Sequence, residues 1–333
     1  MQKDKIQLYQ NQVFVTDNVE GIVPEFLTLL RGVIDSPDIP LNVSRSYLQA
    51  DGAVKKISNY ITRKVADKLN SLYKKDRKGF EEKWNDIKVV IEYGMLSEDK
   101  FFEKAQKFAL YPTVNNEYFT FEELKEKISK TQTDKDGNLI ILYASNINEQ
   151  HSYVESAKAK GYEVLLLDSP IISHLIQKIE TSNEKLNFTR VDSDVIDKLI
   201  KKDEKEVSKL DDKEKEKLKT IIEEVVPKEK YTVQIEAIES SSPPFVITVP
   251  EFMRRMKEMQ QSGGNGMFGN MPEMYNLIIN VNNPICSDIL NSKGKAKKER
   301  LINQSLDLAK LSQNLLKGEE LTSFIKRSLD LIK

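Results

Sequence analysis

The chain has 333 residues, of which 31% are charged, and a formal net charge of −1. This balance excludes the basic bias that nucleic-acid binding favours, and no apolar run approaches the roughly 20 residues that span a bilayer. A single cysteine excludes an internal disulfide, and two histidines leave no zinc-binding pattern. The N-terminus lacks the apolar core of a signal peptide. We therefore expect a cytoplasmic protein of two or three domains that binds neither nucleic acid nor membrane.

The N-terminal stretch predicts a strand, a helix, a loop and a second helix. Apolar Leu8 to Val15 has strand character, Ile22 to Leu30 is amphipathic, and the prolines, aspartates and glycine of residues 31–40 indicate a loop. The following residues, 39–49, present Arg45 among Asn, Ser and Gln. A guanidinium forks onto phosphate oxygens and keeps its charge, so this loop can bind an anion. Alternatively, Arg45 caps a helix or forms a surface ion pair.

The same stretch carries a dense pattern in six segments: Leu8–Tyr9, Val13–Asp17, Val23–Leu27, Leu30–Ser36, Ile39–Arg45 and Leu48–Gln49. This pattern resembles the middle domain of the 90-kDa heat-shock protein chaperones, in their bacterial form. The resemblance implies that Arg45 reaches the ATP held by a separate N-terminal domain and supports its hydrolysis in trans, with Gln49 beside it and Asn42 shaping the turn. It also implies a middle plus C-terminal fragment of an ATP- and Mg-dependent protein. Alone, this fragment is expected to bind no cofactor and to hydrolyse no ATP.

Residues 58–108 have a helical pattern almost throughout, because their apolar side chains recur every three or four positions. Gly79 and Gly94 are expected to separate the helical segments. The single tryptophan, Trp84, lies in this apolar pattern. It is a candidate client contact, since aromatic side chains often anchor interfaces. The alternative is that Trp84 packs in the core.

A strand–helix–strand unit is predicted between residues 139 and 168. A Thr120 and Glu123 pair predicts a helix start before it, and a tight turn at 136–138 leads into the buried-type strand Leu139–Tyr143. This order favours a small parallel sheet and resembles the family's small α/β/α unit. No phosphate-binding glycine motif follows either strand, and no acid–base cluster accompanies Asp168, so an α/β enzyme is disfavoured.

Charged residues fill the stretch 199–219, which we interpret as a hinge into the last domain. Strands are expected at Tyr231–Ile238, Phe245–Val249 and from Tyr275 to Ile285. Between the last two strands, a helix is expected to begin at Pro250. Its candidate client-binding residues are Phe252, Met253, Met256 and Met259. Methionine suits surfaces that accept many partners, and family members carry a client-contacting helix here. Ordinary core packing is the alternative.

Two amphipathic helices close the chain. Their apolar side chains are expected to pair with the same helices of a second copy, as a four-helix bundle with twofold symmetry, which is the dimer contact that the resemblance implies. The residues predicted for this contact are Leu301, Leu308, Leu315, Leu321, Phe324 and Ile325. Packing of these helices within one chain is the alternative.

The predicted fold class is α/β (α+β). The predicted domains are the remainder of a large α/β/α unit (1–62), a helical connector (63–112), a small α/β/α unit (113–200) and a dimerisation domain (205–333). The resemblance implies part of an ATP-dependent chaperone that binds and remodels partly folded client proteins as a homodimer. The rival interpretations are a nucleotide-independent dimeric holdase and a structural dimerisation module.

Overall fold

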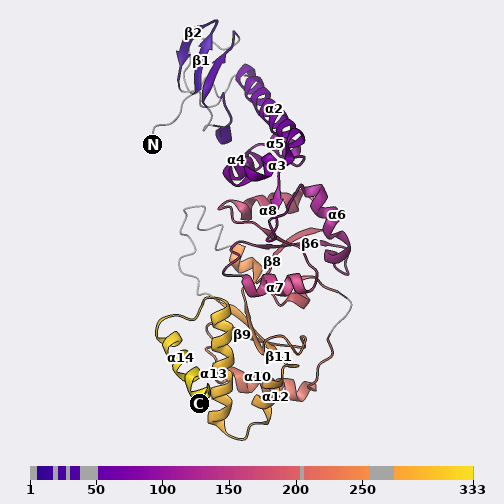
Figure 1. Ribbon diagram of the computed structural model, residues 1–333, viewed down its shortest axis with the longest axis vertical. Coiled ribbons are helices and arrows are strands. Elements are labelled where there is room, and N and C mark those ends of the chain that lie inside the picture. Colours follow the sequence, from indigo (N-terminus) through magenta and orange to yellow (C-terminus); the bar gives the residue numbers. More distant parts are fainter. Residues whose placement is uncertain are drawn as a thin grey trace. The chain divides into compact units, whose positions relative to one another are not determined.

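The computed structural model describes residues 6–17, 22–27, 31–37, 52–202, 206–255 and 274–332. Its contacts divide the chain into two compact units. Unit 1 comprises residues 1–112, 116–126 and 169–182, and unit 2 comprises residues 113–115, 127–168 and 183–333. Helices and several small sheets alternate along the chain (Figure 1). The predicted α+β class is therefore confirmed.

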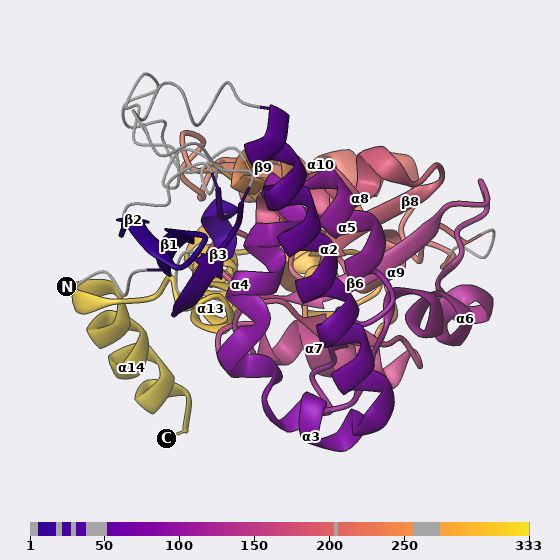
Figure 2. The same ribbon diagram turned by 90° about the horizontal axis from the view of Figure 1, so that it is seen from above.

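Unit 1 begins with a three-stranded sheet in the order β2-β1-β3, grouped together in Figure 2. Its strands are β1 (Ile6–Gln10), β2 (Val13–Thr16) and β3 (Gly32–Asp35). The single strand predicted from Leu8 to Val15 is wrong: β1 and β2 form a hairpin. The reason is the turn, where Asn11 and Gln12 have φ of 47° and 66°. Positive φ at both central residues closes a two-residue hairpin.

Two further expectations for this region are corrected. Residues 31–40 were predicted as loop, but β3 lies within them and pairs parallel to β1. Within the predicted amphipathic segment 22–30, the described residues form one short 3-10 helix, η1 (Glu25–Leu27), in which Phe26 and Leu27 are buried. Leu8 of β1 and Ile22 are fully buried in one small apolar cluster.

The predicted helical segment is confirmed. It contains α2 (Gly52–Lys75), α3 (Arg77–Glu82), α4 (Trp84–Ser97) and α5 (Asp99–Ala105). An aromatic core joins α3, α4 and α5 to η1, and its neighbouring ring centroids lie 4.7–6.4 Å apart. Its members are Phe26, Phe80, Trp84, Phe101 and Phe108.

The expected breaks at Gly79 and Gly94 are both wrong, because α3 continues through Gly79 and α4 through Gly94. The hydrogen that replaces a side chain at Gly94 leaves room for two rings of the aromatic core. A Cβ atom there would lie 2.7 Å from Cδ2 of Phe26 and 2.9 Å from Cδ1 of Phe101. Gly94 is therefore a close-packing position and not a helix end.

The remaining elements of unit 1 are β4 (Tyr111–Pro112), β5 (Tyr118–Phe119), the start of α6 (Phe121–Gln132), and α8 (Ile172–Ser182). The predicted start of α6 is confirmed, since the Thr120 backbone N–H donates to Glu123 at 2.8 Å. Arg77 connects α3 to this corner. Its guanidinium donates to Glu81, to both oxygens of Glu123 and to the Tyr118 carbonyl.

Unit 2 contains the predicted parallel sheet, in the order β7-β6-β8. Its strands are β6 (Leu139–Ala144), β7 (Val164–Leu166) and β8 (Leu186–Arg190), and α7 (His151–Ala159) and α9 (Ile196–Leu199) accompany them. Gly137, with φ of 80°, makes the predicted turn before β6. Leu142, Ala144, Ala157 and Val164 are fully buried in the core between this sheet and α7.

The second sheet of unit 2 has the order β10-β11-β9. Its strands are β9 (Tyr231–Glu236), β10 (Phe245–Thr248) and β11 (Tyr275–Asn280), in the three places that the sequence predicted, although β11 ends at Asn280 and not at Ile285. Helix α10 (Asp212–Glu223) precedes these strands in the chain, and α12 (Pro284–Asn291), α13 (Lys295–Ser312) and α14 (Gly318–Ile332) come after β11. The stretch 199–219, interpreted as a hinge, contains most of α10. Leu218 there is fully buried, so this part of the stretch packs against the core through Leu218, while most of its other side chains are exposed.

Helix α12 was not predicted, because residues 284–285 were assigned to the preceding strand. Its start follows ordinary capping rules: the Asn283 side chain accepts from the Ile285 N–H, and Pro284 occupies the first turn. Cys286 on this helix is fully buried among apolar residues.

Candidate interaction site

Several predicted site residues lie outside the part of the chain that the structure describes. These are the three residues of the arginine loop and two of the methionines: Asn42, Arg45, Gln49, Met256 and Met259. Among the described residues, no group of three or more His, Cys, Asp or Glu side chains is arranged to hold a metal ion. In the same residues, no helix has the length and apolarity that a membrane crossing requires.

Trp84, predicted as a client contact, is buried instead. It is 2% exposed and its ring lies 6.2 Å from that of Phe80, within the aromatic core of unit 1. A side chain enclosed in this way offers no surface to a partner. The alternative of core packing describes its position.

Phe252 is the most exposed of the predicted client-contact residues in the described part of the chain. It lies in a helical turn, residues 251–255, and 72% of it is exposed. Met253 beside it is half-buried. Contact with a partner would remove the apolar surface of this ring from water, which favours binding.

The opposite side of this turn is ionic. Glu251, Arg254 and Arg255 are spaced i, i+3 and i+4, which places them together on a helix. Arg254 is only 5% exposed, and its guanidinium donates to both oxygens of Glu251. Arg255 donates to Glu251 at 2.8 Å and to the carbonyl of Phe188 in β8 at 2.7 Å.

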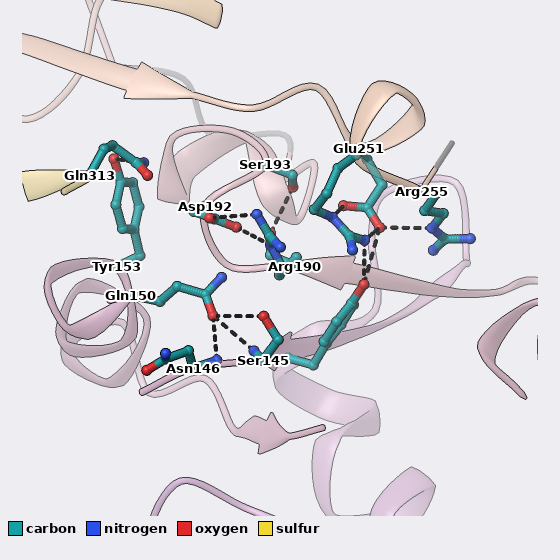
Figure 3. A network of polar contacts seen from close by, with 12 residues as sticks. Ser145, Asn146, Gln150, Tyr153, Arg190, Asp192, Ser193, Glu251, Arg255 and Gln313 are labelled. Carbon is teal, nitrogen blue, oxygen red and sulfur yellow. Dashed lines mark hydrogen bonds and ion pairs between the residues drawn. The ribbon is translucent and has the colours of Figure 1, made fainter. Parts of the chain in front are cut away.

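Tyr143 of β6 completes this cluster. Figure 3 shows two of its members, Glu251 and Arg255, from close by. The Tyr143 hydroxyl accepts from Arg254 and donates to Glu251, and the Arg254 guanidinium lies 5.5 Å from the centre of the Tyr143 ring. Tyr143 is 1% exposed. Burial acts to raise the pKa of Glu251, but the guanidiniums of Arg254 and Arg255 outweigh it and hold that pKa below its usual value. We call Tyr143, Glu251, Arg254 and Arg255 the Tyr143 clamp.

Sequence reasoning missed the clamp. The spacing of its three charged residues is visible in the sequence, and could have been interpreted as a helical ion-pair set. Tyr143, however, stands 108 positions before Glu251, inside an apolar strand pattern that indicated only burial. Nothing local to Tyr143 predicts a charged partner.

A second set of contacts holds the strand before the turn. Tyr153 of α7 donates to the Ile247 carbonyl in β10, and Gln313, at the end of α13, donates to the same oxygen. The side chains of Tyr153 and Gln313 lie next to each other in Figure 3. The Val249 N–H donates to the Asp192 carbonyl at 3.2 Å. Residues 247–255 are therefore fixed to the parallel sheet and its helix α7 at several points.

The predicted dimer residues divide into two groups. Four of them are half-buried: Leu301 and Leu315, which pack against the core of their own chain, and Leu321 and Phe324 on α14. Leu308 and Ile325 are 48% and 49% exposed. Two further leucines, Leu311 and Leu329, are also large, apolar and exposed on these helices. Partial packing within the chain and exposure to solvent thus coexist on α13 and α14.

Ion pairs connect the two terminal helices. Asp307 of α13, which is 8% exposed, accepts from Arg327 of α14. Lys310 pairs with Glu320 at 3.2 Å. These contacts bridge the hairpin of α13 and α14 at two places and hold it together as one element.

Together, the fold and these contacts define an α+β protein with two notable features. One is an exposed aromatic side chain on a helical turn that is held to the parallel sheet, and the other is a terminal helix hairpin with exposed leucines. A family model described as Hsp90 protein matches residues 1–324. The chain belongs to the Hsp90 protein family, which confirms the resemblance found in the sequence.

Curated proteins that are similar to this chain bear chaperone names. A protein named Chaperone protein HtpG from Bacteroides thetaiotaomicron is 44% identical over 400 aligned positions, which include all of this chain and 59% of the relative. One of the same name from Porphyromonas gingivalis is 45% identical over 315 positions, 93% of this chain and 46% of the relative. A third, from Geobacter sulfurreducens, is 30% identical over 186 positions, 55% of this chain and 29% of the relative. The chain thus spans about three-fifths of the length of the Bacteroides relative.

Proposed function

We propose that this chain supplies the client-binding and dimer-forming parts of an ATP-dependent cytoplasmic chaperone. Family membership supports the chaperone class. The client-binding part of the proposal rests on Phe252. This large apolar side chain is 72% exposed, and it lies on the same helical turn as the Glu251 and buried Arg254 ion pair. Partly folded proteins expose apolar segments, and Phe252 with Met253 can cover such a segment by apolar contact.

The test of client binding is suppression of aggregation of an unfolding protein such as heated citrate synthase, without nucleotide. We expect Phe252→Ser with Met253→Ser to weaken suppression several-fold. The matched control is Val207→Ser, because Val207 is 84% exposed in unit 2 but lies outside residues 247–255. Equal suppression by wild type and the double variant would remove Phe252 from the client surface. Suppression without nucleotide would in addition favour a holdase activity.

The proposed dimer contact uses the exposed apolar side chains of α13 and α14. Burial of four such residues and their symmetry mates provides the apolar centre that a stable twofold interface needs. The residues are Leu308, Leu311, Ile325 and Leu329. We expect a solution mass near twice 38.3 kDa, measured by sedimentation at several concentrations.

Leu308→Asp with Ile325→Asp is expected to give a folded monomer, because a carboxylate cannot be buried unpaired in an apolar contact. Leu72→Asp is the control, since Leu72 is comparably exposed at 44% but lies on α2 of unit 1. A wild-type monomer at micromolar concentration would contradict the proposed contact.

The part of the proposal that concerns ATP rests on the family resemblance. Arg45 would stabilise phosphate charge on ATP, in the manner of an arginine finger, with Gln49 and Asn42 as its neighbours in the loop. ATP and Mg²⁺ would be held by another domain of the whole protein, and we assign neither to the described residues. In a protein that includes the nucleotide site, Arg45→Ala should slow hydrolysis with little change in ATP affinity. The control is Arg31→Ala.

A further inference from the structure

We propose that the Tyr143 clamp is a positioning device that fixes the direction in which Phe252 faces, so that a partner's apolar segment meets a preformed contact. The inference rests on the proposed client-binding function of Phe252. It assigns Tyr143 and Arg254 a role as positioning residues, because neither is exposed enough to touch a client itself.

The geometry of one helical turn connects the clamp to Phe252. Successive residues of a helix are rotated by about 100°, so side chains at i, i+3 and i+4 share a face and the side chain at i+1 points away from it. Glu251, Arg254 and Arg255 occupy the shared face and Phe252 occupies the i+1 position. Rotation of the turn about its axis would therefore move Phe252 and at the same time break the hydrogen bonds from the turn to Tyr143 and to the Phe188 carbonyl.

The hydrogen bonds that leave the turn reach different parts of the parallel sheet, and this arrangement opposes such rotation. Arg254 meets the Tyr143 hydroxyl on β6, and Arg255 meets the Phe188 carbonyl on β8. The Val249 N–H, just before the turn, meets the Asp192 carbonyl that follows β8. Three separated attachments leave the turn no axis about which it can pivot freely.

Burial makes these attachments sensitive to the loss of any partner. Arg254 is 5% and Tyr143 is 1% exposed, so the guanidinium depends on Glu251 and Tyr143 for much of the hydrogen bonding that it would otherwise make to water. If Tyr143 lost its hydroxyl, Arg254 would keep Glu251 as its counter-ion but would lose a buried hydrogen bond, and the turn would move to hydrate Arg254. A contact side chain that is held in place before binding loses less freedom when a partner arrives, which strengthens binding.

The first measurement reads the direction and mobility of position 252 itself. Cys286 is fully buried, so Phe252→Cys provides one accessible thiol for a nitroxide spin label. In an otherwise wild-type chain we expect a restricted spectrum. Tyr143→Phe, which removes a single oxygen atom, and Arg254→Met should each give a more mobile spectrum.

The control is Arg77→Met. Arg77 forms a comparable set of bonds, to Glu81 and Glu123, but lies in unit 1. It should leave the spectrum at position 252 unchanged, which separates loss of the clamp from a general loss of stability. Arg254→Lys keeps the charge but not the planar fork, and should restore part of the restriction. An unchanged spectrum in Tyr143→Phe and in folded Arg254→Met would overturn the proposal.

The second measurement reads binding with Phe252 intact. The probe is reduced, carboxymethylated α-lactalbumin, which stays unfolded. We expect Tyr143→Phe to raise the Kd roughly two- to tenfold, the effect of one lost hydrogen bond, while Arg77→Met leaves it unchanged. Unaltered affinity in a variant whose spin label has become mobile would contradict the role of orientation in binding.

The two measurements separate failure of the clamp from failure of the proposed function. If Phe252→Ser binds the probe as tightly as wild type, the client site is wrong, yet the spin label still reports whether the clamp exists. If Phe252→Ser loses binding but the clamp variants change neither mobility nor affinity, the client site stands and the clamp is wrong.

Discussion

Tyr153 and Gln313 stand 160 residues apart and donate to the same backbone oxygen, that of Ile247, at 2.7 and 2.8 Å. Gln313 also donates to the Tyr153 hydroxyl, so the three groups form a closed set. Their elements are α7, beside the parallel sheet, the end of α13, and β10 of the other sheet. This set therefore joins the two sheets of unit 2 and the terminal helix hairpin at one point.

Tyr153→Phe tests this joint. Tyr153 is 9% exposed, and the burial that surrounds its hydroxyl raises its pKa, so the hydroxyl stays protonated and donates at any ordinary pH. Loss of the bond should lower the free energy of unfolding of unit 2 by about 1 kcal/mol, the usual net value of a buried hydrogen bond. Urea unfolding combined with hydrogen exchange at the β10 amides measures the change.

Tyr162→Phe is the matched control. Tyr162 is a half-buried tyrosine in the same unit, and its hydroxyl takes no part in the set around Ile247. It should change stability by a few tenths of a kcal/mol at most, as surface substitutions do. Equal losses in the two variants would mean that the Ile247 set adds nothing specific.

The elements that sequence predicted well are those with strong local signals. The strand at Leu139–Tyr143 combines an apolar run with a preceding glycine turn, and α6 begins where Thr120 and Glu123 indicated. The hairpin of β1 and β2 was missed because its turn residues, Asn11 and Gln12, are not the Asn-Gly or Asp-Gly pair that usually indicates one.

The interaction site was harder to predict, because its contacts are not local. Exposure of Phe252 and burial of Trp84 follow from three-dimensional packing, whereas in the sequence both lie in similar helical apolar patterns. The Tyr143 contact with Arg254 joins two elements that are more than 100 residues apart. Periodicity identifies which face of a helix is apolar, but it does not identify what that face meets.

Gly94→Ala is expected to destabilise unit 1. The added methyl group would lie 2.7 and 2.8 Å from two ring carbons of Phe26 and 2.9 Å from Phe101. Such overpacking costs about 1–3 kcal/mol, whereas alanine favours the helix over glycine by only about 1 kcal/mol. Urea unfolding followed by the fluorescence of Trp84, the single tryptophan and a member of the same aromatic core, measures the net loss.

Gly52→Ala provides the opposite case. Gly52 begins α2, and a Cβ atom there meets nothing within 4 Å. This variant should be neutral or slightly stabilising. If Gly94→Ala were equally well tolerated, the rings of Phe26 and Phe101 would have to move apart without cost, contrary to close packing.

Cys286 should resist alkylation in the folded chain. It is fully buried, and that burial raises its thiol pKa to about 12. The thiolate is the reactive form, so both access and ionisation oppose the reaction at neutral pH. We expect no modification by iodoacetamide over hours in native buffer, and complete modification in concentrated urea, as measured by mass spectrometry. Rapid native labelling would show that α12 opens readily from the core.

The pair of Arg77 and Glu123 should make unit 1 sensitive to acid. The hydrogen bonds from Arg77 hold the pKa of Glu123 below its usual value of 4.5, against the burial that acts to raise it. A carboxyl group with a lower pKa in the folded state stabilises the fold when ionised. This stabilisation is complete above the unfolded-state pKa, and it is lost as the pH falls through the folded-state pKa.

Glu123→Gln should therefore lower stability at pH 7 and flatten the loss of stability below about pH 4.5. Because both side chains are more than one-third exposed, solvent screening keeps the effect at or below about 1 kcal/mol. The control is Glu122→Gln on the same helix, where the exposed Glu122 pairs with Lys125 only three residues away. Urea midpoints from pH 3 to 7 decide the matter: parallel curves for wild type and Glu123→Gln would show that Arg77 does not stabilise the ionised carboxylate.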